Sequence, residues 1–344
     1  MSATPQAAVR NSISRYQLEM HDLFATILGV VGLLAISSVL LPVATRINFP
    51  FTVLLALVGV VLGGLVVAFG HTDIWLIGDF MRAVSSLEIT SDAVFFLFLP
   101  TLVFEAALSI NVRQLLDDLL PILVLAIVGL LISTSMVGYA LWWASGVSLV
   151  ACLLLGTIVS ATDPVAVIAL FKDMGAPHRL ATLVEGESLF NDATAIVLFS
   201  ILAAMLVSGQ DPAFGAGTLD FLRVFIGGVV VGYVLAWLTC NLIGLLQDVP
   251  LVEVTLTVCL AYLTFIVAEH YLHVSGVMAV VTAGLVLGSY GRTKISPESW
   301  DHLHVIWEQL AFWANSLIFF LVGLLVPSLL LDVTGREFGW LCVL

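Results

Sequence analysis

Two short polar stretches interrupt otherwise apolar sequence, and they contain the side chains best suited to chemistry. The first reads Ser-Ala-Thr-Asp-Pro and ends at Pro164. Pro164 lacks a backbone N–H and disfavours helical geometry at Asp163, so a helix should kink or unwind here. Carbonyls freed by the break, together with the Asp163 carboxylate, could then face a cation. The alternative is an ordinary proline kink in which Thr162 and Asp163 cap the following half-helix.

The second polar stretch covers residues 185–192 and reads Glu-Gly-Glu-Ser-Leu-Phe-Asn-Asp. At 100° per residue, Ser188 and Asp192 lie one turn apart on one helix face. Glu187 and Asn191 have the same spacing. Four polar groups would therefore form a stripe along one helix. Ionisable residues inside a bilayer are costly and usually line a substrate or proton path.

An interfacial position is the alternative for these acids. It suits Glu185 better than Glu187, and it suits Asp192 least, because a mostly apolar run to Val207 follows. A further candidate, Glu105, has apolar neighbours. It either reaches the same cavity or marks the membrane edge, and the sequence leaves both open.

The composition shows which elements must position these residues. Of 344 residues, 61% are hydrophobic and 10% are charged, and the mean hydropathy is +1.15. A soluble domain carries about a quarter charged residues, so lipid must be the solvent for much of this chain. Backbone groups must be bonded internally in lipid, so a spanning segment is a helix by default. The net charge of −13 offers no basic patch to nucleic acid.

We therefore predict an all-α polytopic membrane protein located in a cell membrane. A bilayer core needs roughly 20 apolar residues as helix, and ten runs approach that length. They lie near 23–45, 50–70, 93–110, 118–144, 147–171, 180–208, 219–246, 250–272, 274–290 and 303–331. Residues 1–22 are expected to be a tail, and residues 23–344 a single transporter domain. An eleventh run begins near Phe338 and is cut off at Leu344, so we expect C-terminal helices to be missing.

In its two polar stretches the sequence resembles the monovalent cation/proton antiporters. The resemblance is carried by Ala161-Thr162-Asp163-Pro164 on one predicted helix and by residues 187–192 on the next. The asparagine–aspartate pair is typical of the sodium/proton exchanger branch thought to be electroneutral, whereas the other main branch has two adjacent aspartates. Supporting similarity lies at 95–107, 274–277 and 315–323.

The resemblance implies an antiporter fold with inverted repeats, a core and a dimerisation domain, and usually a homodimer. It also implies a crossing of two broken helices, of which this sequence holds one, near Thr162-Asp163. The second repeat would be truncated. Glu187 is implied to form a structural ion pair with an arginine that would lie beyond Leu344.

The mechanism we expect is competition between a metal cation and a proton for Asp192. Burial disfavours the charged form of a carboxylate, so a sequestered Asp192 would hold either a proton or Na⁺, but not both. Sodium is a hard cation that suits oxygen donors. We expect Asp192, Ser188 and Thr162 to coordinate it, with Glu105 as a further donor.

Asn191 and Asp163 are assigned to holding the two helices together. We expect a transporter rather than an enzyme, with no resident cofactor and with Na⁺ and H⁺ as the transported partners. Three alternatives stay open. They are a truncated antiporter fragment that does not transport, a cation channel, and an intramembrane aspartyl protease. The protease would use Asp163 and Asp192, but its Gly-x-Gly-Asp motif is absent.

Overall fold

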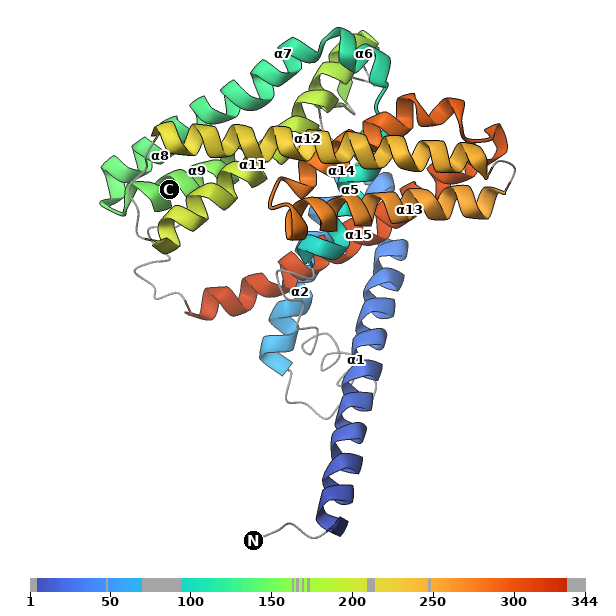
Figure 1. Cartoon of the computed structure of the whole chain (residues 1–344). Coiled ribbons are helices and arrows are strands. Elements are labelled where there is room, and N and C mark those ends of the chain that lie inside the picture. The colour runs from blue at the N-terminus through green and yellow to red at the C-terminus, as the bar shows by residue number, and fades with distance from the viewer. Residues whose placement is uncertain are drawn as a thin grey trace. The chain divides into compact units, whose positions relative to one another are not determined.

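The computed structural model describes most of the chain as helices (Figure 1). The described residues are 5–47, 49–69, 94–162, 164, 167–168, 170–171, 174–208, 214–246 and 249–332, and side chains are described from Phe24 onward with a few gaps. Within these ranges every regular element is helical. Two compact units can be separated, one formed by residues 1–94 and 312–344 and the other by residues 95–311.

The first unit contains α1 (Pro5–Arg46), α2 (Phe51–Phe69) and the later part of α15 (Pro297–Asp332). Helix α1 begins at Pro5, so the predicted tail over residues 1–22 is helical from that position onward. Helices α2 and α15 approach closely at glycines. A Cβ placed on Gly59 would lie 2.6 Å from the Phe320 carbonyl oxygen.

The second unit holds both polar stretches. Its elements are η1 (Val94–Phe98), α5 (Leu99–Ser109), α6 (Val112–Asp117), α7 (Leu119–Leu123), η2 (Val124–Gly129), α8 (Leu130–Ser145), α9 (Leu149–Ser160), α11 (His178–Ser208), α12 (Phe214–Leu245), α13 (Pro250–Ile266), η3 (Val267–Tyr271), α14 (Gly276–Ser289), η4 (Gly291–Thr293) and the first part of α15. Each of the ten predicted apolar runs contains helix, whereas the eleventh lies outside the described residues.

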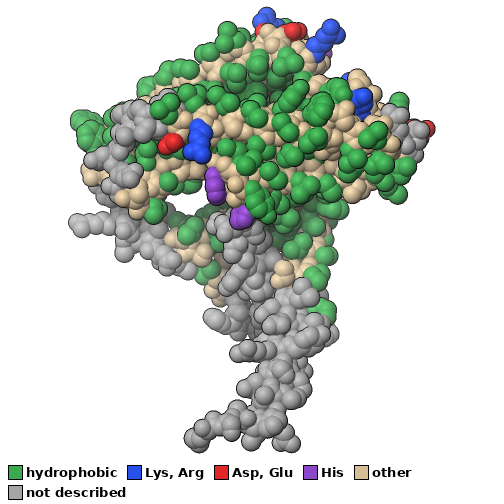
Figure 2. Space-filling view, viewed as in Figure 1, with side chains coloured by type: hydrophobic (Ala, Val, Ile, Leu, Met, Phe, Trp, Pro, Cys, Tyr) green, Lys and Arg blue, Asp and Glu red, His purple; other side chains and the backbone are tan. Residues whose placement is uncertain are grey.

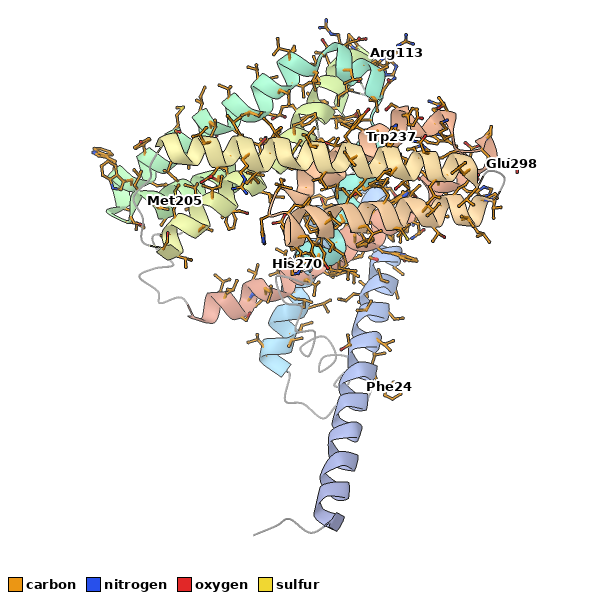
Figure 3. The ribbon with its side chains drawn as sticks, viewed as in Figure 1. Phe24, Arg113, Met205, Trp237, His270 and Glu298 are labelled. Carbon is orange, nitrogen blue, oxygen red and sulfur yellow. The ribbon has the colours of Figure 1, made fainter. Side chains whose placement is uncertain are left out.

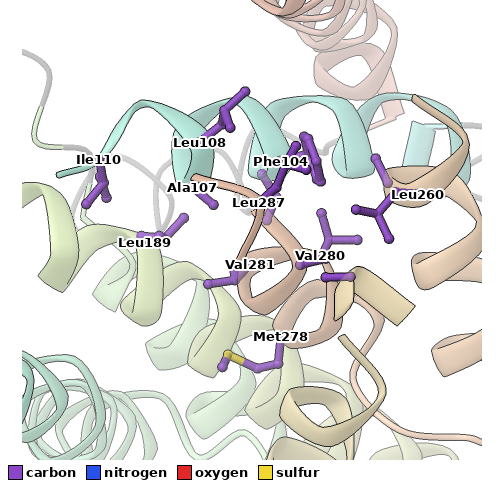
Figure 4. Close-up of a cluster of buried hydrophobic side chains, with 14 of the residues drawn as sticks. Phe104, Ala107, Leu108, Ile110, Leu189, Leu260, Met278, Val280, Val281 and Leu287 are labelled. Carbon is purple, nitrogen blue, oxygen red and sulfur yellow. The ribbon is translucent and has the colours of Figure 1, made fainter. Parts of the chain in front are cut away.

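Helix α14 forms the centre of the second unit, where it packs against α12, α5 and α13. Its residues from Gly276 to Val281 are all buried, together with Ala283, Gly284 and Leu287. A helix that is apolar all round is a buried helix. Figure 4 shows Val280 beside Leu260 and Leu287 beside Phe104 of the neighbouring helices, with Val281 on the side of Leu189 of α11. This apolar core supports α11, the helix that carries the second polar stretch.

The outer surface of the helices is apolar, as a lipid-facing surface must be. Among the described residues, seven helices are long and apolar enough to cross a membrane: Thr26–Arg46, Phe51–Ala68, Leu119–Ser145, His178–Ser208, Leu219–Leu245, Pro250–Tyr271 and Pro297–Leu330. Two shorter apolar helices are Val94–Ser109 and Leu149–Ser160. Figure 2 shows hydrophobic side chains spread over the visible face of the second unit. The prediction of an all-α polytopic membrane protein is confirmed.

The helix break predicted near Pro164 is also confirmed. Helix α9 ends at Ser160, and the backbone of Ala161 is extended, with φ −70° and ψ 127°. A helical hydrogen bond forms again beyond the break, where the Ile168 N–H donates to the Pro164 carbonyl at 2.9 Å. Pro164 has no backbone N–H to donate to the preceding turn, and it disfavours helical geometry at the residue before it, which explains why the helix ends here. Asp163 lies outside the described residues.

Candidate functional site

Side chains of α11 contact the chain where α9 breaks. The Ser188 hydroxyl donates to the Thr162 carbonyl oxygen at 3.2 Å. The Asn191 amide donates to the Thr162 hydroxyl oxygen at 3.0 Å. Ser188 and Asn191 are buried, whereas Thr162 is exposed. Two side chains from adjacent turns of α11 therefore hold one residue of the broken segment through its backbone and its side chain.

The same Asn191 amide group also binds along its own helix. It donates to a Glu187 carboxylate oxygen at 3.0 Å, over the i to i+4 spacing expected from the sequence. Both amide hydrogens are thus accounted for, and hydrogen bonds to a charged acceptor are among the stronger ones. The Asn191 side-chain oxygen is buried, and no described residue donates a hydrogen bond to it.

A cavity of about 370 Å³ lies beside this junction. Its polar lining consists of Ser133, Ser160, Thr162, Glu187 and Asn191, and its remaining walls are glycine and aliphatic side chains of η2, α8 and α11. The Ser160 hydroxyl donates to the Ser133 hydroxyl oxygen at 2.9 Å, which ties the end of α9 to α8. The helix break therefore faces a space that is large enough for an ion and water.

Asp192 follows Asn191 on α11, and its side chain is exposed. Ala161 and Thr162 at the helix break are exposed as well. The Asp192 side chain is thus exposed in this structure rather than buried as predicted, and its role in cation exchange stays a prediction.

Glu105 lies on α5, and the structure does not bring it to the cavity. Its carboxylate accepts a hydrogen bond of 2.9 Å from the Ser109 hydroxyl, one turn further along the same helix. Helix α5 packs mainly on α14 rather than on α9, which explains the separation. No arginine or lysine in the described part of the chain pairs with Glu187, whose expected ion pair stays a prediction. No three acidic, histidine or cysteine side chains among the described residues gather into a metal cluster.

Two features of this region were missed in the sequence. Ser133 lines the cavity from α8, and only its small polar side chain within an apolar run signals it. Asp118 accepts two hydrogen bonds from Arg179, at 2.6 and 2.7 Å, joining the start of α7 to the start of α11. These hydrogen bonds lower the pKa of Asp118 below its ordinary value of 3.8. Because Asp118 and Arg179 lie 61 residues apart, nothing in the sequence indicated that they form a pair.

Comparison with known proteins identifies the family. Residues 32–344 match the sequence profile of the transmembrane region of sodium/hydrogen exchangers. The chain belongs to this family. Its motif at the helix break and its Asn191–Asp192 pair are thus parts of an exchanger chain, and the resemblance drawn from these residues is confirmed.

The relatives of this exchanger chain include bacterial antiporters. It is 35% identical to the Na⁺/H⁺ antiporter NhaH of Halobacillus dabanensis over 321 residues, which cover 92% of this chain and 77% of the relative. It is 38% identical to the Na⁺/H⁺ antiporter ApNhaP of Aphanothece halophytica, and here the match covers 93% of this chain and 57% of the relative. The chain thus spans between about half and three quarters of these relatives' lengths.

A solved antiporter structure shows the same fold. The sodium proton antiporter MjNhaP1 from Methanocaldococcus jannaschii superimposes with a TM-score of 0.68, at 22% sequence identity. The superposition covers 88% of this chain and 71% of the other. At this identity the likeness shows the fold alone. The fold is thus that of an antiporter, and the apolar helices together with the family and its relatives make this exchanger chain a multi-pass cell membrane protein.

Proposed function

We propose that this chain exchanges Na⁺, or another monovalent cation, for H⁺ across a cell membrane. The family and the relatives named as Na⁺/H⁺ antiporters support this proposal. The observation that carries it is the Asn191 amide group, which joins Thr162 at the helix break to Glu187 on α11. These hydrogen bonds hold three polar side chains together within a stretch of the chain that is otherwise apolar.

The oxygen atoms near the break suit a hard cation such as sodium. The Thr162 carbonyl is outside any helix and lies 3.2 Å from the Ser188 hydroxyl oxygen. That hydroxyl donates its one proton to the carbonyl and keeps lone pairs that can accept a cation. Asp192 lies one helical turn after Ser188 and adds a carboxylate. Unwound carbonyls beside a carboxylate are the ion-binding arrangement of transporters with broken helices.

Exchange follows when cation and proton cannot share the carboxylate. We assign Asp192 to carry Na⁺ in one state and H⁺ in the other, while Asn191 and Asp163 keep the two helices in register. The exposed position of Asp192 lets the ion enter from one side. Obligatory exchange then requires the core to move against the dimerisation domain of a homodimer, so that the site opens to each side in turn.

Flux measurement tests the proposal. The purified chain is reconstituted into liposomes, and Na⁺ uptake is driven by an outward H⁺ gradient. Asp192→Asn removes the only group assigned to exchange a proton, so uptake should fall to the level of empty liposomes. Asp220→Asn on α12 is the matched control, because Asp220 is also an exposed aspartate of a spanning helix. It should transport at the wild-type rate.

The other outcomes separate the alternatives. Wild-type rates in Asp192→Asn would remove Asp192 from the mechanism. Uptake that carries net current without countertransport of H⁺ would indicate a channel. If the unmodified chain moves no Na⁺ at all, the alternative of a transport-inactive fragment holds instead.

A further inference from the structure

A second cavity lies in the same unit, away from the helix break. Its volume is about 340 Å³, within the range of small-molecule sites. Its walls come from the end of α5, the start of α6, the end of α14, η4 and the first turns of α15. None of its lining residues belongs to the cavity at the helix break. The proposed exchange mechanism does not use it.

The charged side chains that line this cavity are all basic. Arg113 and Arg292 both face it, with His304, and no aspartate or glutamate lines it. Glu298 and Asp301 flank Trp300 in the sequence, but neither is part of the lining. In the part of the chain that the structure describes, neither arginine forms an ion pair. Two like charges that face one small space repel each other unless an anion lies between them.

One wall of the cavity is built by the Arg292 side chain and two aromatic rings. The Arg292 guanidinium lies 5.6 Å from the centre of the Trp300 ring, within cation–π range. The Trp300 ring in turn meets the His304 ring edge-on, with the ring centres 5.1 Å apart. These contacts limit the conformations of the Arg292 side chain. A guanidinium held in one orientation is pre-organised for the paired hydrogen bonds that phosphate accepts.

The position of the cavity along the helices indicates where its ligand comes from. Ser109 and Ser289, which line it, are the last residues of α5 and α14, and α15 begins nearby at Pro297. Helix ends of a membrane protein lie at the interface, where tryptophan is also enriched. Figure 3 shows Arg113 at the edge of the second unit rather than within the bundle. Phosphate groups of lipid headgroups lie at this depth.

We propose that this cavity binds a phosphate group through Arg113 and Arg292, presented either by an anionic lipid headgroup or by free inorganic phosphate. Basic pockets between membrane helices bind such headgroups in other proteins. The cavity walls supply two guanidinium groups and an imidazole. The aromatic ring of Trp300 would lie against the glycerol region of a bound lipid.

Native mass spectrometry of the detergent-purified chain tests this inference. Phosphatidylglycerol and phosphatidylcholine are titrated separately, and a further arm uses inorganic phosphate alone or as a competitor. The double variant Arg113→Gln/Arg292→Gln should bind phosphatidylglycerol about tenfold more weakly. Arg46→Gln is the matched control, because Arg46 is an exposed arginine at a helix end that does not line the cavity. It should bind phosphatidylglycerol as the wild type does.

Each outcome bears on the proposal. Binding of phosphatidylglycerol that phosphate displaces, and that the double variant loses, supports a lipid source. Binding of inorganic phosphate without the lipid, lost in the same variant, supports a free anion. Arg292→Lys keeps the charge without the planar fork and should bind with intermediate affinity. Equal binding by wild type and double variant, with both proteins eluting as single folded species, would overturn the proposal.

Discussion

Helix α12 meets α14 through backbone, whereas the segment that follows α9 meets α11 through polar side chains beside a cavity. A Cβ on Gly228 would lie 2.5 Å from the Ser275 carbonyl oxygen, and Gly232 faces Ala279 in the same way. At the other contact, Asn191 and Ser188 reach the broken segment through hydrogen bonds. Both pairs are built from apolar helices. The difference teaches that close packing supplies a fixed support, while the proposed ion site lies where the helices leave space.

The largest effect is expected from filling the close contact. Gly232→Ala places a methyl group against the Ala279 backbone, which cannot rotate away as a side chain would. Overpacking of a core costs about 1–3 kcal/mol, and we expect the upper end here. Thermal unfolding in detergent measures the change. Gly64→Ala is the control, because no atom lies within 4 Å of the added methyl group, and it should be neutral or stabilising.

Equal melting temperatures for Gly232→Ala and Gly64→Ala would contradict the close approach of α12 and α14. The support would then be looser than described, and the contrast between the two contacts would disappear.

A second prediction concerns the polar contact. Asn191→Ala removes the donor to Thr162 and to Glu187, which should destabilise the fold by about 1–3 kcal/mol. Na⁺ flux should fall further, by at least about tenfold, since each 1.4 kcal/mol of lost orientation is a factor of ten. Liposome flux and thermal unfolding are measured on the same preparation. Asn241→Ala is the control, because Asn241 also makes two hydrogen bonds, but to Trp237 and Tyr290.

The two substitutions should differ in which property they change. A loss of flux in Asn191→Ala no larger than in Asn241→Ala would mean that Asn191 supports the fold only.

The sequence predicted the fold more fully than the site, and the reason is physical. Long apolar runs must be helices in lipid, so the ten runs could be placed from composition alone. The break after Ser160 could also be predicted locally, because Pro164 has no backbone N–H to continue the helix. The i to i+4 spacing of Glu187 and Asn191 likewise predicted that they share a helix face, and they form a hydrogen bond.

Contacts between distant segments could not be predicted in this way. The position of Glu105 depends on α5 packing against α14, and nothing in its neighbouring residues encodes that choice. The exposure of Asp192 depends on which segments cover α11, again a property of the assembled helices. Ser133 and Ser160 lie 27 residues apart and meet only because α8 and α9 pair.

A third and smaller effect is expected from the hydrogen bond between Ser160 and Ser133, which ties the end of α9 to α8. Ser160→Ala leaves the Ser133 hydroxyl without its donor at the end of α9. A hydrogen bond of this kind contributes about 0.5–1.5 kcal/mol, so thermal unfolding should shift modestly. Ser135→Ala is the control, because the Ser135 hydroxyl bonds only to a carbonyl of its own helix. A shift no larger than in that control would show that α8 does not hold the break in place.

The smallest effect is expected at the start of α11, where Arg179 joins Asp118. The guanidinium holds the pKa of Asp118 below 3.8 by donating hydrogen bonds to its charged form. Such a group stabilises the fold fully above its ordinary pKa, and this stability is lost as the pH falls through the lower folded value. The Arg179 side chain is 71% exposed, so solvent screens the pair.

Asp118→Asn should therefore lower the melting temperature slightly at pH 7, and the gap to wild type should close as the pH falls below about 4. In an Arg179→Gln background the same substitution should have little effect at any pH, because the partner is already gone. A gap that stays constant down to pH 3 would mean that Asp118 acts by packing rather than by charge. Close packing, as between α12 and α14, would then join the starts of α7 and α11, and the ion pair would contribute little.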